Sequence, residues 1–289
     1  MQRSNDSDTF SLVICCPDAV GIVAAVATLV AEHGGSLVES NHHTDIEQNW
    51  FFMRNVISID SLDVDIEGFR SAFEPLARRW DMRWYVRDNR QKQRLVILAS
   101  HASHCLEDLL HRYRSDELAC TIPCVISNHD NLRSMVQWHD IPFHHVPVPK
   151  DDKSAAFAEM EALIAQYEAE TVVLARYMQI IPPGLCEQYS GKLINIHHSF
   201  LPSFVGANPY QKAYDRGVKL IGATCHYVTE DLDEGPIIEQ DVIRTSHRDS
   251  LDDLVCKGRD VERSVLARAV RWHLEDRVLV YDNRTVVFH

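Results

Sequence analysis

The sequence predicts an α/β protein with two domains, a small one over residues 1–88 and a larger one over residues 89–289. The length supports two domains, because 289 residues are more than one hydrophobic core usually holds. The pattern also changes at the polar stretch 87–93. Before it the element order is strand–helix–strand–strand–helix–strand, and after it strands and helices alternate. We therefore expect a ferredoxin-like βαββαβ domain followed by a Rossmann-like domain with a mostly parallel sheet.

The small domain begins with the apolar, β-branched stretch 9–16, which is typical of a strand. From residue 17 to residue 34 the apolar residues recur at helical spacing, with Asp18 as the expected N-cap and glycines at the end. The remaining predicted elements are strands over 36–45 and 49–59, a helix over 66–80 and a strand over 82–87.

The larger domain begins with residues 94–100, a continuous apolar run of the kind found in parallel strands that are buried on both faces. The same pattern of strands separated by amphipathic helices then repeats. Strands are expected over 120–128, 143–148, 171–178, 192–198, 221–228 and 236–243, and helices over 103–113, 132–140 and 154–169. Ligands of such sheets bind outside the carboxyl ends of the strands.

Composition excludes several classes of protein. The formal net charge is −13 and no run of Lys and Arg is long enough to indicate a nucleic-acid-binding face. No apolar run approaches the ~20 residues of a membrane span, and the N-terminus lacks the apolar segment of a secretory signal, so we expect a cytoplasmic protein. The 8 cysteines include no CxxC pair, which favours reduced thiols. Adjacent histidines on a strand point to opposite faces, so pairs such as His197-His198 do not predict a metal site.

Three polar residues in the second half of the larger domain are the candidates for catalysis. Asn195 and His197 are two apart on a predicted strand and therefore project from the same face. Asp233 follows in an acidic turn between two later strands. An amide, an imidazole and a carboxylate can together polarise a carbonyl, stabilise the oxyanion formed on attack and activate a nucleophile. Taken singly, a histidine at a strand end or an aspartate in a turn would indicate only ordinary hydrogen bonding.

Several separated blocks resemble the folate-dependent formyltransferase fold. They are NIHHSFLPSF, the turn Gly206-Ala207-Asn208, IGATCHYV and EDLDEGPII. The family's catalytic asparagine, histidine and aspartate fall on Asn195, His197 and Asp233. The resemblance implies a 10-formyltetrahydrofolate substrate and no separate cofactor. From their chemistry we expect Asn195 and His197 to stabilise the formyl oxygen and Asp233 to deprotonate the attacking water, directly or through a relay; which of His197 and Asp233 takes the proton stays open.

The resemblance also implies where the folate binds. The segment after the fourth strand of the larger domain and the loop before the aspartate would surround it. The substrate-binding residues expected are Tyr177, Met178, Gln179, Ile180, His226 and Gly235. Members of the family often have an arginine at the position of Gln179, so Arg176 is a possible substitute in binding the glutamate tail. The alternative for Met178 and Ile180 is that both belong to the core.

The small domain resembles an ACT domain, because the turn CPDAVGIVA joins its first strand to its first helix. The resemblance implies an amino-acid effector site at Asp18, Gly21 and Ile22, and pairing of domains into a homo-oligomer, a dimer or a tetramer. The alternative is a ferredoxin-like domain that serves oligomerisation alone.

The combination of an ACT-like domain with a formyltransferase-fold domain resembles the formyltetrahydrofolate deformylase family. Two features favour water over an amine as the acceptor. Residues 99–106 contain no glycine, whereas the related transferases bind a phosphate with a glycine-rich turn there. His198 stands where transferases tend to have a proline or a small residue. The function implied is hydrolysis of 10-formyltetrahydrofolate to tetrahydrofolate and formate, which would supply purine synthesis. The alternatives are a formyltransferase acting on an amine such as glycinamide ribonucleotide, and a non-catalytic sensor of amino acids and folate.

Overall fold

The computed structural model describes residues 8–203 and 208–289. It divides into two compact units. Unit 1 comprises Met1–Lys92, Asp276–Leu279 and Val286–His289, and unit 2 comprises Gln93–Glu275 and Val280–Thr285. The boundary after Lys92 lies close to the predicted one. The C-terminal segments differ from the prediction, which assigned all of 89–289 to the second domain, because two of them pack within unit 1.

Ion pairs explain why the first of these C-terminal segments belongs to unit 1. The carboxylate of Asp276 lies 2.9 Å from the guanidinium of Arg87, and Nη1 of Arg277 lies 3.0 Å from Oε1 of Glu39. Asp276 is buried, and burial raises its pKa although Arg87 opposes that effect. Long-range pairs of this kind leave no local signal in the sequence.

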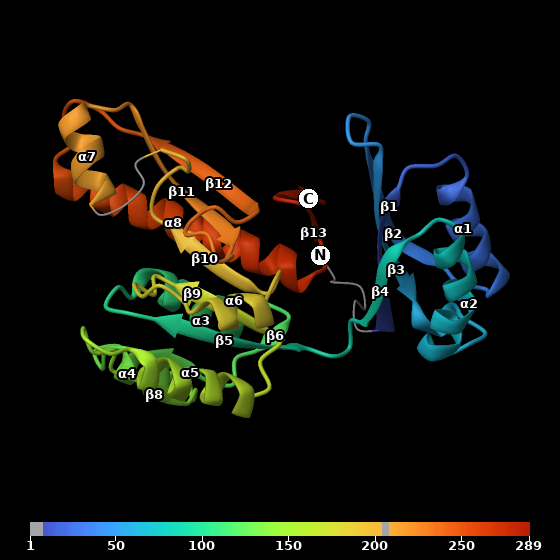
Figure 1. The fold of residues 1–289 in the computed structure, drawn as a ribbon, viewed down its shortest axis with the longest axis horizontal. Coiled ribbons are helices and arrows are strands. Elements are labelled where there is room, and N and C mark those ends of the chain that lie inside the picture. The colour runs from blue at the N-terminus through green and yellow to red at the C-terminus, as the bar shows by residue number, and fades with distance from the viewer. Residues whose placement is uncertain (1–7, 204–207) are drawn as a thin grey trace. The chain divides into compact units, whose positions relative to one another are not determined.

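Unit 1 has the predicted βαββαβ order, and its four-stranded antiparallel sheet has the strand order β2-β3-β1-β4. Helices α1 and α2 cover one face of this sheet (Figure 1). Phe69 and Phe73 of α2 are fully buried against Phe10 of β1 and its neighbours. The elements are β1 (Thr9–Pro17), α1 (Ile22–Glu32), β2 (Leu37–Asp45), β3 (Trp50–Ser58), the 3₁₀ turn η2 (Ile59–Ser61), α2 (Ile66–Arg79) and β4 (Arg83–Asp88).

The start of α1 differs from the prediction. Gly21, and not Asp18, is the N-cap, and no side chain caps the helix. Gly21 has a φ of 98°, a conformation that strongly favours glycine, so the chain turns sharply into the helix at this residue.

Unit 2 is built on a larger, mostly parallel sheet, as predicted. Its main path has the strand order β12-β11-β10-β9-β5-β7-β8, and β6 pairs with β5 beside it. The strands from β10 to β8 are parallel, whereas β11 and β12 are antiparallel to their neighbours. The strands are β5 (Gln93–Ala99), β6 (Cys120–Thr121), β7 (Val125–Ser127), β8 (Phe143–His145), β9 (Thr171–Ala175), β10 (Leu193–His197), β11 (Leu220–Tyr227) and β12 (Ile237–Arg244). A short hairpin, β13 (Val278–Tyr281) and β14 (Arg284–Val287), ends the chain.

Helices pack on both faces of this sheet. Val96, Leu98, Val172 and Leu174 alternate along β5 and β9 and form one core with α5 and α6. Helix α8 runs along β10, β11 and β12 and packs against α3 (Figure 1). The helices are α3 (His104–Arg114), α4 (Arg133–Trp138), α5 (Ser154–Gln166), α6 (Pro183–Gln188), α7 (Pro209–Arg216) and α8 (Leu251–Leu274). Within residues 8–203 and 208–289, no helix combines the length and the apolar character that a bilayer span requires.

Candidate active site

Asn195 and His197 lie at the carboxyl end of β10, as predicted, and their neighbours are supplied by strand pairing. In the antiparallel register between β10 and β11, His226 stands directly opposite Asn195. His197 and His226 are buried. The sheet therefore places an amide and two imidazoles side by side at one end of β10.

Asp233 reaches this group from the turn between β11 and β12. A side chain at Gly235 would place its Cβ 1.9 Å from the carbonyl oxygen of Tyr227, so only glycine allows the turn to close this tightly. Asp233 itself has a φ of 60°, in the left-handed region that non-glycine residues rarely occupy. Such strained residues cluster at functional sites, where the surrounding structure holds them in place.

The contacts of Asp233 define the geometry of the site. Its Oδ1 lies 3.2 Å from Nδ1 of His197 and 3.8 Å from Nε2 of His226. The Nδ1–H of His197 therefore donates to the carboxylate. The opposite ring atom, Nε2 of His197, is buried and has no hydrogen-bond partner among the described residues. A buried polar atom without a partner points to a ligand that supplies one.

Hydrogen bonds orient the amide of Asn195. Nδ1 of His226 lies 2.9 Å from the carbonyl oxygen of Tyr227, which can only accept, so Nδ1 carries the proton. Burial lowers the pKa of His226, so its ring is neutral and its Nε2 is an acceptor. Nδ2 of Asn195 lies 3.2 Å from that atom and donates one N–H to it. Its second N–H is left for a ligand.

Electrostatics keep Asp233 ionised. Burial by itself would raise the pKa of this carboxyl, but the hydrogen bond from His197 and the electrostatic effect of that ring outweigh burial and lower the pKa below its ordinary value. Asp233 is therefore a carboxylate at neutral pH, suited to accept a hydrogen bond from a water molecule.

These residues line a cavity of about 940 Å³ in unit 2. Asn195, His197, His226 and Asp233 all contribute to its wall. Of the other predicted substrate-binding residues, Tyr177, Met178, Gln179 and Ile180 also line it. Gly235 does not; its part is to let the turn close behind Asp233.

The segment after β9 forms an apolar wall of the cavity. Met178 and Ile180 are 58% and 66% exposed, so neither belongs to the core. Ser100 accepts from the backbone N–H of Met178 at 3.0 Å and donates to Asn128 at 2.7 Å, which ties the segment to β5 and β7. Next to it, Nζ of Lys153 donates to Oε1 of Gln179 at 3.1 Å.

The loop after β10 is fixed from β11 and β12. The hydroxyl of Thr224 donates to the carbonyl oxygen of Ser199 and accepts from the N–H of Leu201, both at 2.9 Å. Gln240 donates to the same hydroxyl at 2.9 Å and to the carbonyl oxygen of Leu201 at 3.0 Å. These hydrogen bonds fix the direction in which the chain continues after His197. The predicted turn 206–208 lies partly outside the described residues.

The residues predicted for an effector site lie at the turn before α1 in unit 1. Gly21 forms that turn, and Asp18 precedes it with its backbone N–H bonded to the carbonyl oxygen of Asn49 at 2.9 Å. Ile22 is buried in the core of unit 1, so its side chain is occupied by packing.

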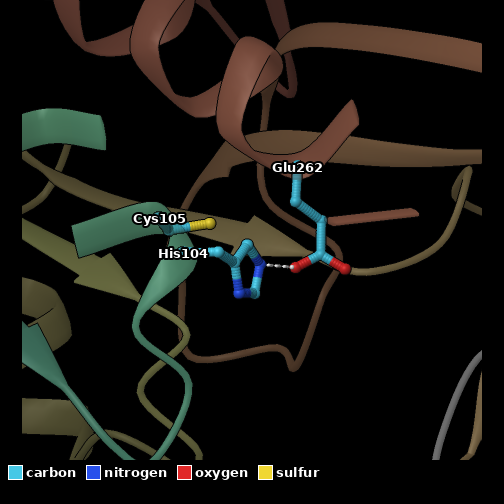
Figure 2. Close-up of side chains that lie close together, drawn as sticks. All are labelled: His104, Cys105 and Glu262. Atoms are coloured by element: carbon cyan, nitrogen blue, oxygen red, sulfur yellow. Dashed lines mark hydrogen bonds and ion pairs between the residues drawn. The ribbon is translucent and has the colours of Figure 1, made fainter. Parts of the chain in front are cut away.

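A group of side chains around one buried carboxylate, partly in the wall of the cavity, was not predicted from the sequence. Glu262 of α8 is 1% exposed and accepts from Nε2 of His104 at 2.7 Å and from the hydroxyl of Tyr210 at 2.5 Å. Nε of Arg176 lies 3.3 Å from the same carboxylate, which orients the guanidinium toward Glu262, although its Nε and Nη1 have no hydrogen-bond partner among the described residues. We call Glu262, His104, Tyr210 and Arg176 the Glu262 cluster. Figure 2 shows the ring of His104 pointing at the carboxylate.

His104, Cys105 and Glu262 lie close enough to share a metal ion, since their ligand atoms fall within 4.8 Å of one another (Figure 2). Their chemistry argues against one. Burial and the nearby charge of Glu262 raise the pKa of Cys105 well above its usual range, so in the absence of an ion it is a thiol. The carboxylate of Glu262 already has two donors and the cation of Arg176. The group is better explained as an ion-pair cluster.

His198 joins the catalytic residues to the Glu262 cluster. Its ring lies 5.2 Å from that of His197 and 6.2 Å from that of Tyr210, centroid to centroid. Burial, together with the positive charge of Arg176, lowers the pKa of His198 to about 4. This imidazole is therefore neutral at pH 7.

The low pKa of His198 predicts a loss of stability in mild acid. An unfolded histidine takes up a proton near pH 6.5, whereas folded His198 does so only near pH 4, so the free energy of unfolding falls as pH drops between these values. His198→Gln should remove up to about 3 kcal/mol of this loss. Urea unfolding at pH 7.5 and at pH 4.5 measures it, with His247→Gln, at an exposed position, as a control. Equal losses in wild type and His198→Gln would contradict the expectation.

Comparisons with known proteins agree with the site. The formyl transferase family model matches residues 93–270. Formyltetrahydrofolate deformylase from Synechocystis sp. is 49% identical over 97% of this chain and 98% of its own. The crystal structure of a formyltetrahydrofolate deformylase from Pseudomonas syringae pv. tomato superposes with a TM-score of 0.96 at 63% identity, covering 97% of this chain and 94% of that one.

A second kind of structure matches a smaller share of the chain. The structure of glycinamide ribonucleotide transformylase 1 from Symbiobacterium toebii has a TM-score of 0.65 at 25% identity and covers 71% of this chain and 97% of that one. The deformylases, by contrast, match over nearly the whole chain. Since both the sequence and the whole fold agree with them, the chain belongs to the formyltetrahydrofolate deformylase family.

Proposed function

We propose that the protein hydrolyses 10-formyltetrahydrofolate to tetrahydrofolate and formate, with the folate as substrate and not as a resident cofactor. The observation that carries the proposal is the group of buried His197 with half-buried Asn195 and Asp233, whose polar atoms line one cavity. The names of the full-length relatives support it.

In the first step, water attacks the formyl carbon. Oδ1 of Asp233 is engaged by His197, so Oδ2 is the oxygen that holds the water and takes its proton. As the C–O bond forms, negative charge moves to the formyl oxygen. The second N–H of Asn195 and Nε2–H of protonated His197 donate to that oxygen, and the carboxylate of Asp233 stabilises the charge of His197.

In the second step, the tetrahedral intermediate collapses. The bond between the formyl carbon and N10 breaks, and the proton taken up by Asp233 passes to N10. The products are tetrahydrofolate and formic acid, which ionises to formate. The apolar wall at Met178 and Ile180 suits the pterin, whose polar edge would be read by backbone groups.

Formate release without an acceptor tests the proposal. Purified protein is mixed with 10-formyltetrahydrofolate alone, and formate and tetrahydrofolate are followed together by NMR. Equal amounts of both products are expected. Tetrahydrofolate that forms only after glycinamide ribonucleotide is added would instead establish a transferase. No turnover in either mixture would favour the non-catalytic sensor.

We also propose that unit 1 acts as an ACT-type module that binds an amino acid near Asp18 and Gly21 and assembles the chain into a homo-oligomer. The βαββαβ order and the turn at Gly21 support this. A cytoplasmic role in supplying formate for purine synthesis belongs to the same proposal. Turnover that is independent of added glycine and methionine, in a chain that sediments as a monomer, would contradict the module's role.

A further inference from the structure

The Glu262 cluster takes no part in the proposed hydrolytic steps, although burying its charged carboxylate is unfavourable in free energy. Glu262 is an ionised carboxylate in the interior: burial would raise its pKa, but the hydrogen bond from His104 and the charge of Arg176 outweigh it and lower the pKa. Isolated buried charges are rare unless they are paired and hydrogen-bonded. The three partners come from α3, from α7 and from the end of β9, so one carboxylate fixes three separate elements.

The fit of Tyr210 shows that the cluster is a built feature. A Cβ at Gly258 would lie 2.1 Å from the hydroxyl of Tyr210, so the phenol lies directly on the bare backbone of α8 one turn before Glu262. Glycine is unfavourable in the middle of a helix. Arg176 is also constrained, with a φ of 62°. Gly258 is an unfavourable residue inside a helix, but it lets Tyr210 pack in a fixed position. Arg176 has an unfavourable backbone conformation, and its own side chain is held toward Glu262.

The cluster forms part of the cavity wall. Tyr210 and Arg176 line the cavity, and His198 lines it between them and His197. The remaining wall falls into two groups. One comes from the segment after β9 and the turn before Asp233, where we place the folate; the other comes from the starts of α7 and α8, with Asn208, Gln211, Leu251 and Val255.

A formyl transferase must admit a second substrate beside the formyl group, whereas a hydrolase needs room for water alone. The fold is shared with a glycinamide ribonucleotide transformylase, so the sheet itself does not decide between the two. With the folate on one group of wall residues, an amine has to approach from the other group.

We propose that the Glu262 cluster and His198 fill the acceptor side of the catalytic cavity, so that water, and not an amine, reaches the formyl carbon. This specificity role rests on the proposed hydrolysis. Tyr210 and His198 occupy the space, and Glu262 keeps Tyr210 and Arg176 from moving aside. If the wall is opened, the nitrogen of an amine attacks the formyl carbon, the bond to N10 breaks, and the proton lost by the amine goes to N10. The products are a formamide and tetrahydrofolate.

Product partition tests the proposal. Wild type, Tyr210→Ala and Glu262→Gln are incubated with 10-formyltetrahydrofolate and an excess of glycinamide, and formate and N-formylglycinamide are quantified by NMR. Wild type should give formate only. The formamide share should be at least tenfold above the wild-type background in Tyr210→Ala and smaller but detectable in Glu262→Gln. Tyr214→Ala, an exposed tyrosine of the same helix, is the matched control and should behave as wild type.

Each outcome is informative. Wild type without formate release would refute the proposed hydrolysis itself. Wild type that hydrolyses, together with a Tyr210→Ala variant that still yields formate only, would overturn the specificity role alone. Should Tyr210→Ala be folded but inactive, binding of glycinamide is measured by ligand-observed NMR. Binding to the variant but not to wild type supports the proposal, and binding to neither overturns it.

Discussion

Replacement of Asp233 by Asn should lower kcat by a factor on the order of 10³, because the water then has no base to take its proton. Asn is the informative substitute. It has nearly the shape of Asp, and it is among the few residues that tolerate the φ of 60° found here. The variant should fold and bind substrate with a nearly unchanged KM. An effect on kcat alone would therefore report the loss of the carboxylate chemistry.

The same turn offers a matched control for this measurement. Asp231 is exposed and lies two residues before Asp233, so Asp231→Asn removes one negative charge from the same turn. Its kcat should stay within about twofold of wild type, because surface charges contribute little. Steady-state formate release gives both constants, and thermal unfolding confirms the fold. A kcat for Asp233→Asn within tenfold of wild type would remove Asp233 from the role of base.

The fold and the reacting residues are largely predictable because their signals are local. Alternation along a strand is enough to put Asn195 and His197 on one face, and apolar runs separated by helical patterns are enough to predict a parallel sheet. The position of His226 opposite Asn195, by contrast, has no local signal in the sequence. It depends on the antiparallel register of β10 and β11, which the sequence does not reveal.

Glu262 shows why the rest of the site could not be predicted. It lies in the middle of α8, a 24-residue helix rich in charged residues, where a glutamate ordinarily faces water. Its burial depends on partners from three distant segments. Gly258 was the one available signal, since a glycine inside a long helix often marks a close packing contact. The packing of the C-terminal segment at Asp276 within unit 1 was not predicted for the same reason, because its partner Arg87 is 189 residues away in the sequence.

Asn195→Ala should lower kcat by roughly 10²–10³-fold, the usual cost of removing one oxyanion donor, or about 2.7–4 kcal/mol of transition-state stabilisation. The neutral ring of His226 holds one N–H of the amide, so the other has a fixed direction before substrate arrives. A donor fixed in advance stabilises the transition state more than the ground state, and for that reason KM should change little. Asn195→Asp should be at least as damaging, since it has the same shape but places an acceptor against the developing oxyanion.

Asn131→Ala is the control. It removes an exposed amide that donates to the carbonyl oxygen of His101 outside the cavity and should leave kcat unchanged. If Asn195→Ala instead raised KM in proportion and kept kcat, Asn195 would bind the ground state, and His197 alone would stabilise the oxyanion.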